Sequence, residues 1–481
     1  MRLVAIGGSD AGVSAALRAR ELDPSAEVIL VVADAYPNYS ICGIPYYVSG
    51  EVADWHNLAH RTISDLEATG TILRLDTVAR RIDPVAHTVT LGSPDGSDET
   101  LEYDALIVGT GALPIRPPIA GLDHLGRDHG VHLLHSMGDT FAFMRTLQNR
   151  QARRAVIVGA GYIGLEMAEA LTTTGLAVTQ VEQLPEVLPT VDPGLGALVR
   201  AELHRREVNV LCSTRVDAIE TACPGGQHRL EVRATGPDGQ PVHLPADVVL
   251  VSVGVRPDTE LAAAAGAELG IKGAIVVDGQ MRTNLPDVLA AGDCAVTHHP
   301  LLGTTYLPLG TTAHKQGRIA GENAIGGTRQ FAGSLGTQVV KVFDLVAART
   351  GLRDHEATPA GFDPFTVASE ADDHKAYYPG SHKIAMRYTG DRRTGQLLGL
   401  QLAGHLNSEI AKRIDVASTA IFNRMTVEAI SDLDLSYTPP LGSPWDALQH
   451  GAQAWTTSVS RPSLRISSAR SVSTHADHRP Y

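Results

Sequence analysis

The stretch AVIVGAGYIGLEMAEALTTTGLAVTQVEQ, residues 155–183, decides the fold of this chain. An apolar strand leads into Gly159, Gly161 and Gly164, which have the spacing G-x-G-x-x-G. A helix and a second apolar strand follow, and this strand ends at Glu182, 23 residues after Gly159. Glycines in such a turn let the backbone and a helix N-terminus approach a pyrophosphate, while the acid binds a ribose hydroxyl. The stretch therefore predicts a Rossmann-like, dinucleotide-binding domain.

The end of the second strand also indicates which nicotinamide cofactor binds. The carboxylate of Glu182 would repel a 2′-phosphate. The next residue is Gln183, not an arginine or lysine that would attract one. The pattern favours NADH over NADPH.

A second copy of the strand, turn and helix opens the chain, in RLVAIGGSDAGVSAALRARELDPSAEVILVVAD (residues 2–34). Gly7 and Gly12 take the first and third glycine positions, and Ser9 takes the second. Asp34 is the nearest acid after the second strand, about two positions later than the pattern requires. We expect a second dinucleotide to bind here, through Gly7, Gly12 and Asp34. The alternative for either turn is a glycine elbow with a purely structural role.

Two further segments run from an apolar strand into glycines at its end. They are YDALIVGTGALPIRPP (103–118) and TNLPDVLAAGDCAVT (283–297). An acid that follows a strand can bind a ribityl hydroxyl at the ligand-binding edge of a sheet, although a helix N-cap is the alternative. The candidate cofactor-binding residues of these segments are Gly109, Thr110, Gly111, Gly292 and Asp293.

Cys42, in NYSICGIPYYVSG (38–50), is the candidate reactive residue. Position 45 is proline and position 47 is tyrosine, so neither C-x-x-C nor C-x-x-x-x-C is present. A lone thiol beside a redox cofactor suggests chemistry through a mixed disulfide or a sulfenic acid. The alternative is a buried cysteine that only packs.

Composition excludes several classes of protein. The 481 residues carry a net charge of −13 without a basic tract, which disfavours nucleic acid and anionic membranes as partners. The chain has no long apolar run, and its first residues lack the pattern of a signal peptide. Its four cysteines and twenty histidines show no metal-ligand spacing. We expect a cytoplasmic protein with reduced thiols and no bound metal.

These motifs, together with VSVGVRPDTELA (251–262) and its candidate cofactor-binding Gly254, stand in a characteristic order. In this respect residues 1 to about 455 resemble the flavin-dependent pyridine nucleotide–disulfide oxidoreductases. The resemblance implies an α/β fold with two Rossmann-like domains, one for FAD and one for NAD(H), and an α+β C-terminal domain that forms a homodimer.

The same resemblance predicts the domain boundaries. The FAD-binding domain would comprise residues 1–120 and 246–330, and the NAD(H)-binding domain, 121–245, would be inserted into it. The dimerisation domain would span residues 331–455. Residues 456–481 are polar and rich in serine and arginine, so we expect a disordered tail.

The subgroup can be narrowed at CGIPYY (42–47), which resembles the CGLPYY element of coenzyme A-disulfide reductases and their NADH oxidase and polysulfide reductase relatives. Three C-terminal stretches are similar to the same subgroup: GTQVVKVFDLVAARTGL (336–352), AYYPGSHKI (376–384) and LDLSYTPPLGSPWDAL (433–448). In that subgroup a tyrosine of the last stretch reaches the cysteine of the partner subunit, and Tyr437 holds this position here. A second such tyrosine corresponds to Tyr377 or Tyr378, of which we prefer Tyr378. The alternative for all three is packing at an interface.

Two departures from the subgroup concern the electron acceptor. Ile41 stands before the cysteine, where the relatives carry asparagine. Asp10 stands in the first glycine turn, where the oxidases and peroxidases often carry histidine. Within the resemblance, the flavin and nearby helix ends are expected to lower the pKa of Cys42 from its usual value.

Three functions are compatible with these residues. The first is an NADH-dependent disulfide reductase that acts through Cys42 on coenzyme A disulfide or a related small disulfide, persulfide or polysulfide. The second is an NADH oxidase or peroxidase that cycles Cys42 through a sulfenic acid. The third is a redox flavoprotein that serves a protein partner, which Cys42 and the tyrosine-bearing C-terminal domain disfavour.

Overall fold

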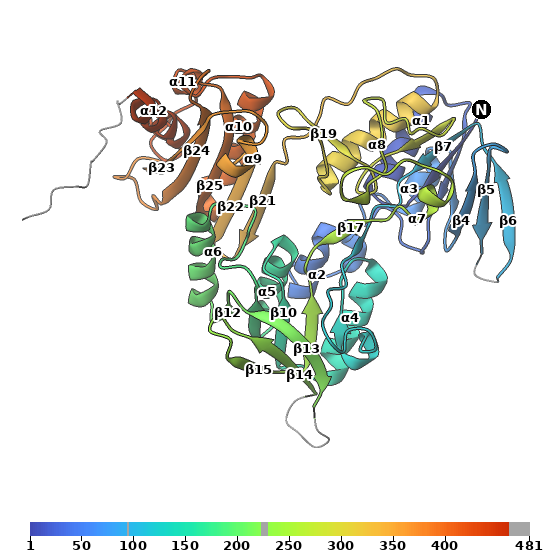
Figure 1. Ribbon diagram of the computed structural model, residues 1–481, viewed down its shortest axis with the longest axis horizontal. Helices are drawn as coiled ribbons and strands as arrows, with labels where there is room; N and C mark the ends of the chain where they lie inside the picture. The colour runs from blue at the N-terminus through green and yellow to red at the C-terminus, as the bar shows by residue number, and fades with distance from the viewer. Residues whose placement is uncertain (94–95, 223–228, 461–481) are drawn as a thin grey trace, which may run out of the picture.

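The computed structural model describes residues 1–93, 96–222 and 229–460, which form three lobes (Figure 1). The first lobe is a parallel sheet of order β18-β7-β1-β2-β3. Its strands are β1 (Arg2–Ile6), β2 (Glu27–Val31), β3 (Thr71–Arg74), β7 (Ala105–Val108) and β18 (Val288–Ala290). Leu3, Val4 and Ala5 are fully buried, as the apolar run at the start of the chain predicts.

Helices and a small sheet cover the two faces of this first sheet. Helices α1 (Asp10–Leu22) and α8 (Gly310–Ala324) share a hydrophobic core with one face. A Cβ at Gly317 or Gly321 would lie 2.2 Å from a carbonyl oxygen of α1, so only glycine permits this close packing of the helices. The other face packs against an antiparallel sheet made of β4 (Val78–Asp83), β5 (Thr88–Gly92) and β6 (Asp98–Glu102).

The second lobe has the same layered arrangement around a parallel sheet, whose strand order is β12-β11-β10-β16-β9. Its strands are β9 (Val131–His132), β10 (Arg154–Val158), β11 (Ala177–Val181), β12 (Asn209–Leu211) and β16 (Val248–Val251). One face packs on α4 (Met137–Arg150), α5 (Tyr162–Thr173) and α6 (Pro193–Arg205). The other packs on an antiparallel sheet of β13 (Arg215–Thr221), β14 (Leu230–Thr235) and β15 (Pro241–Ala246).

Strand β16 corrects the predicted domain boundary at residues 245 and 246. It pairs in parallel with β10, with Val249 opposite Val156, and therefore completes the second sheet. The chain leaves the first lobe through β8 (Ala112–Pro114) and returns through β17 (Val255–Pro257). These two strands pair antiparallel, so both crossings between the lobes lie side by side.

The third lobe is an antiparallel sheet of order β21-β22-β25-β24-β23. Its strands are β21 (Gln338–Val342), β22 (Leu345–Gly351), β23 (Pro364–Asp372), β24 (Lys383–Asp391) and β25 (Leu397–His405). Its helices are α9 (Asp354–Ala357), α10 (Ile410–Phe422), α11 (Val427–Ser431) and α12 (Ala447–Ser460). Helices α10, α11 and α12 bury apolar side chains against this sheet, which gives the lobe a core of its own.

The predicted disordered tail begins too early. Residues 456–460 continue α12, and the remaining residues of that prediction, 461–481, lie outside the described residues. In the part of the chain that the structure describes, no helix combines the length and the apolar character that crossing a bilayer requires.

Candidate active site between the first two lobes

The first glycine turn lies where three predicted segments converge. Gly7 has a φ of +116°, and a Cβ at this position would lie 2.0 Å from the carbonyl oxygen of Gly109. A Cβ at Gly12 would in turn lie 2.0 Å from the carbonyl oxygen of Gly7. The turn after β1 and the end of β7 are therefore in backbone contact. Gly292 completes the group, because its Cβ would lie 2.8 Å from Ala11 in the first turn of α1.

Asp293 follows Gly292 at the same edge of the sheet. Burial raises the pKa of its carboxyl group to about 6, with a smaller contribution from the negative charge of Asp10. Among the described residues, no side chain or N–H donates a hydrogen bond to this carboxylate, although the Asp293 carbonyl oxygen accepts one from Tyr306. A desolvated carboxylate without a donor at the carboxyl end of a strand is suited to the hydroxyl of a bound cofactor.

Asn38 connects the first turn with the segment that carries Cys42. Its N–H donates to the carbonyl oxygen of Gly8 over 2.6 Å, and its carbonyl oxygen accepts from the N–H of His60 over 3.0 Å. Its side-chain Nδ2 is buried without a hydrogen-bond partner. A buried amide donor seldom stays unpaired, so Nδ2 identifies a place for an acceptor at this turn. The donor, the glycine turn and Asp293 together fit FAD.

Three other predicted cofactor residues have local roles in the fold. The hydroxyl of Thr110 donates to the carbonyl oxygen of Asp258 over 2.5 Å, which fastens β7 to the crossing. Asp34 accepts the Tyr36 N–H with Oδ1 over 2.9 Å, in a turn after β2. Gly254 has a φ of +105° in the turn between β16 and β17. Gly111 (φ +74°) has open space at its Cβ position, next to the crossing.

The second glycine turn has the geometry that its sequence predicts. Gly159 (φ +104°) and Gly164 are closed in, because a Cβ at either position would lie within 2.3 Å of a carbonyl oxygen. Gly161, by contrast, has no heavy atom within 4 Å of its Cβ position. Packing does not require this glycine, so the open space is available to a ligand. Glu182 is buried beside the turn, and the residues fit a nicotinamide dinucleotide.

Cys42 lies in a short 3₁₀ turn (Ile41–Gly43) before helix α2 (Ile44–Ser49). Ile44 and Val48 belong to the hydrophobic core formed with α5, and Ile41 packs against the same core. Ile41, which stands where the relatives carry asparagine, therefore packs this segment against the second lobe. The charges that act on the thiol come from both lobes: from Glu166 on α5, and from Asp10 and Asp293 beside the first glycine turn.

The surroundings of Cys42 are acidic. The thiol is exposed to solvent, yet the protein atoms around it still desolvate it. Desolvation raises its pKa most, followed by the negative charges of Glu166, Asp10 and Asp293. The chain's own groups therefore raise the pKa of Cys42, whereas the sequence leads us to expect a lowered value in the presence of the flavin. No second cysteine joins it: Cys212 and Cys294 are free, and Cys223 lies outside the described residues.

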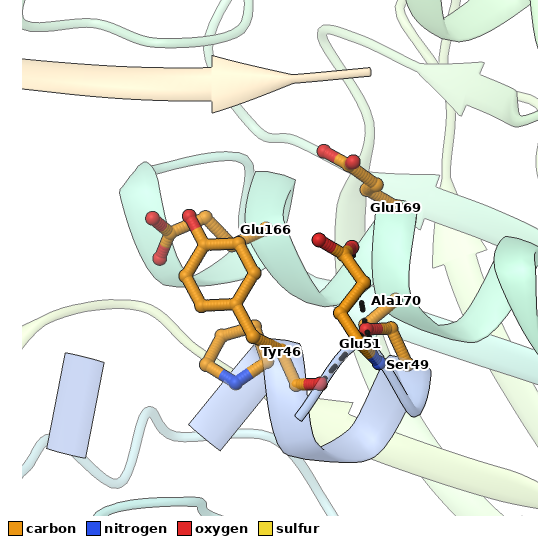
Figure 2. A pocket seen from close by; sticks show the side chains of 7 residues that line it. Tyr46, Ser49, Glu51, Glu166, Glu169 and Ala170 are labelled. Atoms are coloured by element: carbon orange, nitrogen blue, oxygen red, sulfur yellow. Dashed lines mark hydrogen bonds between the residues drawn. The ribbon is translucent and has the colours of Figure 1, made fainter. Parts of the chain in front are cut away.

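Glu166 is a functional candidate that the sequence analysis did not identify. It lies on α5 and faces Tyr46 of α2, beside a cavity of about 10 Å³ (Figure 2). Burial, and then the charge of Glu169, raise the pKa of Glu166 to about 7, while Lys341 opposes the shift. An acid that titrates near neutral pH beside a reactive thiol is suited to hold or release a proton. Its signal in the sequence is a carboxylate within the otherwise apolar stretch YIGLEMA (162–168).

The predicted tyrosines lie on the third lobe. Tyr437 and Tyr378 are 45% and 43% exposed, and among the described residues no hydrogen bond joins either of them to the Cys42 segment. Desolvation, and then the neighbouring Tyr437, raise the pKa of the Tyr377 phenol, so the two side chains lie near each other. The ring of Tyr378 instead packs edge-on against His374, with 5.8 Å between the centroids.

Comparison with known sequence families identifies two regions. The profile described as pyridine nucleotide-disulphide oxidoreductase matches residues 1–317. The profile of the dimerisation domain of the same family matches residues 337–447.

Individual proteins are similar over nearly the full chain. An NAD(P)H sulfur oxidoreductase (CoA-dependent) from Pyrococcus furiosus is 33% identical over 93% of this chain and 97% of its own. An NADH oxidase from Methanocaldococcus jannaschii is 31% identical over 94% of this chain and 98% of its own. The solved structure of an NAD-dependent persulfide reductase from A. fulgidus has a TM-score of 0.88 and 37% identity, over 95% of this chain and 83% of its own.

Proposed function

Because the chain belongs to the pyridine nucleotide-disulphide oxidoreductase family, and is an NAD(P)H-dependent FAD oxidoreductase, we propose that it reduces a small disulfide or persulfide at Cys42. Coenzyme A disulfide and coenzyme A persulfide are the proposed substrates. The observation that carries the proposal is an exposed lone thiol on which charged groups of both dinucleotide-binding lobes act, with no second cysteine in residues 38–50.

The chain's residues support the proposed reaction in order. Bound FAD would accept hydride from the nicotinamide and supply two electrons to sulfur. The Cys42 thiolate attacks one sulfur of the disulfide, forms a new S–S bond and releases one thiolate, which takes up a proton. Two electrons and a further proton then cleave the mixed disulfide, which releases the second thiol and restores Cys42. Glu166, with its pKa about 7, is placed to supply or accept a proton near this sulfur.

The cofactor sites follow from the two turns. We assign FAD to the first turn, with Gly7, Gly12, Gly292 and Asp293, and the nicotinamide cofactor to the second. The buried carboxylate of Glu182 supports a preference for NADH over NADPH, since it would repel a 2′-phosphate.

The proposed assembly is a homodimer, supported by the match to a dimerisation domain. Tyr437 and Tyr378 would then face Cys42 of the second copy. Their phenols, exposed on the third lobe, can donate a proton to a departing thiolate.

A second candidate function is an NADH oxidase that cycles Cys42 through a sulfenic acid, since one relative of 31% identity carries that name. The named relatives give no support to the third function, service to a protein partner.

Anaerobic NADH consumption with coenzyme A disulfide, with counting of the free thiols released, tests the proposal. The expected result is two thiols per NADH, lost in Cys42→Ser while that variant keeps FAD and flavin reduction by NADH. Turnover retained in Cys42→Ser would contradict the mechanism. Absence of thiol release, with rapid NADH loss once oxygen or peroxide is admitted, would instead favour the oxidase.

A further inference from the structure

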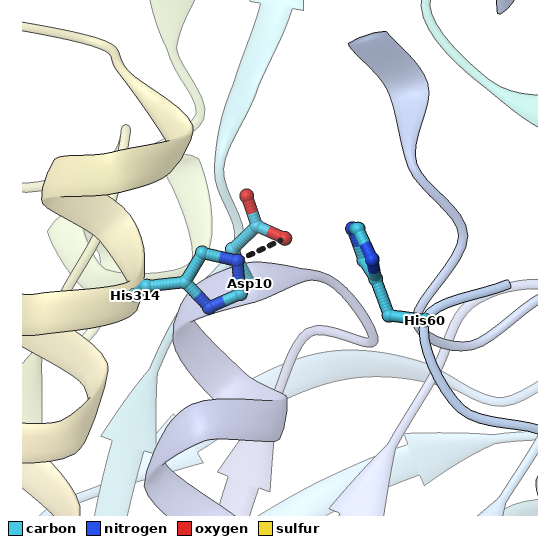
Figure 3. A group of neighbouring side chains, drawn as sticks. All are labelled: Asp10, His60 and His314. Atoms are coloured by element: carbon cyan, nitrogen blue, oxygen red, sulfur yellow. Dashed lines mark ion pairs between the residues drawn. The ribbon is translucent and has the colours of Figure 1, made fainter. Parts of the chain in front are cut away.

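Three side chains capable of binding a metal meet beside the first glycine turn (Figure 3). Asp10 belongs to the first turn of α1, His314 to α8, and His60 to the loop before α3 (Ile63–Ala68). One ligand atom from each lies within 4.8 Å of the other two. The segments are far apart in sequence, so the spacing of the histidines gave no sign of the group.

The contacts of His314 fix its orientation. Its Nδ1 lies 2.9 Å from the hydroxyl of Ser14, one turn along α1 from Asp10, and its Nε2 lies 3.3 Å from Oδ1 of Asp10. A metal-binding histidine usually has one ring nitrogen held by an outer partner while the other faces the ion. Ser14 is positioned to be this partner, and it leaves Nε2 directed at the carboxylate.

His60 supplies the third donor from the opposite side. Its backbone is held by Asn38, whereas among the described residues its imidazole makes no hydrogen bond. The ring faces that of His314 with 6.3 Å between centroids. The imidazole is exposed and can rotate, so it can bring its nitrogen to the separation of roughly 3.3 Å that tetrahedral ligands at about 2.0 Å from an ion require.

We propose that Asp10, His60 and His314 form a binding site for a divalent metal ion of the zinc class. Two imidazole nitrogens and one carboxylate oxygen match zinc, whereas magnesium and calcium prefer oxygen ligands throughout. The side chains of His314 and Asp10 are 47% and 26% exposed, so the ion has a path from solvent. Three protein ligands leave a fourth coordination position open to water or to a substrate atom.

The site would lie close to the reactive thiol. Asn38, which holds the backbone of His60, is joined to Gly8 of the first turn and precedes Cys42 by four residues. An ion held here would therefore place positive charge next to a thiol whose neighbours are carboxylates.

Zinc binding to the FAD-loaded, full-length protein tests the proposal, in a Cys42→Ser background that removes the competing thiolate. Zinc alone is titrated against a chromophoric chelator, and we expect one ion per chain. His60→Ala, His314→Gln and Asp10→Asn should each weaken binding about ten-fold or more. The matched control is His56→Ala, because His56 is an exposed imidazole on the same segment that pairs with Asp54 and stacks on Trp55, away from the three ligands.

X-ray absorption of the zinc-loaded protein should show two imidazoles and no sulfur in the coordination sphere. An unchanged flavin absorption spectrum verifies the fold of each variant, since all three side chains reach the surface or its margin. Failure of the parent to bind zinc, equal binding by the three ligand variants, or a sulfur ligand would each overturn the proposal. The experiment involves no turnover, so its result is independent of the proposed reductase activity.

Discussion

The carboxylate of Glu182 accepts a hydrogen bond from the N–H of Ala160 over 2.8 Å, which ties the end of β11 to the second glycine turn. Its other oxygen accepts from the N–H of Leu184 over 2.9 Å. The acid that the sequence assigns to a ribose is thus also the residue that holds the turn in shape. Any substitution of Glu182 must therefore separate its charge from its hydrogen bonds.

Glu182→Gln makes this separation in part: the amide oxygen keeps an acceptor for the Ala160 N–H and the negative charge is removed, but the amide NH2 cannot accept from the Leu184 N–H. We expect the KM for NADH to rise by about ten-fold and the ratio of kcat/KM for NADPH over NADH to increase, since a 2′-phosphate is no longer repelled. Steady-state kinetics with both cofactors measures the effect. Glu186→Gln is a suitable control, because Glu186 lies nearby on the same lobe but pairs with Arg200. An unchanged cofactor ratio in Glu182→Gln would contradict the assignment.

Glu166→Gln should lower the pKa of Cys42. The charge of Glu166 is the largest of the three carboxylate effects that raise this pKa, and Glu166 is ionised wherever the thiol titrates. We expect the midpoint of the alkylation rate against pH to fall, since the largest of these charges is removed. Glu51→Gln is the matched control, since Glu51 lines the same cavity but is not among the main charges that raise the pKa of Cys42.

The same substitution should change how stability depends on pH. The pKa of Glu166 is about 7 in the folded chain and near 4.5 when unfolded, so the folded state binds the extra proton between these values. Stability therefore falls as the pH rises from about 4.5 to 7, and the full cost of ionisation is present above 7. Glu166→Gln should match the parent at acid pH and exceed it by about 1–3 kcal/mol at pH 8. Urea unfolding of both proteins at several pH values measures this effect. A difference in free energy of unfolding that did not change with pH would refute the prediction.

Lys341→Met should destabilise the junction between the second and third lobes. The Lys341 ammonium of β21 binds the carboxylate of Glu169 on α5, and the Phe343 N–H donates to the same carboxylate over 2.8 Å. Without Lys341 the buried charge of Glu169 is left partly uncompensated, at a cost of about 2–4 kcal/mol. Urea unfolding measures the loss. Adding Glu169→Met to Lys341→Met should recover most of it, and no recovery would show that the loss has another cause.

Tyr437→Phe removes the proposed proton donor and keeps the ring. We expect turnover with a disulfide to fall by about 10- to 100-fold, while the anaerobic rate of flavin reduction by NADH stays unchanged. Tyr377→Phe is the control, because it removes a neighbouring phenol hydroxyl but leaves the proposed donor in place. Equal losses in the two variants would argue that both tyrosines only pack at an interface.

The sequence predicts the two glycine turns because the need for glycine arises from the local backbone. Gly7 and Gly159 have positive φ values, and carbonyl oxygens lie about 2 Å from their Cβ positions, so few other residues are possible. Strand β16 was assigned to the wrong sheet for a related reason. Its four residues are apolar and fully buried, and such a run has the same appearance in either parallel sheet.

Residues whose roles depend on distant contacts were not predicted. Glu166 has its raised pKa because burial at the meeting of α2 and α5 desolvates it, which no spacing in the sequence indicates. His60 and His314 are 254 positions apart: His314 reaches Asp10 because α8 packs on α1, and His60 joins them because Asn38 binds both Gly8 and His60. Asp10, noted only as the residue that replaces a histidine, proves to have two histidines beside it.

Because the second lobe is inserted between the crossing strands β8 and β17, the strands of the two sheets are synthesised in a fixed order. All strands of the second sheet lie between residues 131 and 251, whereas the first sheet needs β18, at residues 288–290. A nascent chain therefore possesses every strand of the inserted lobe before the lobe that surrounds it has its last one. Asp293 emerges later still, so the proposed flavin site can be completed only after every strand of the inserted lobe has been synthesised.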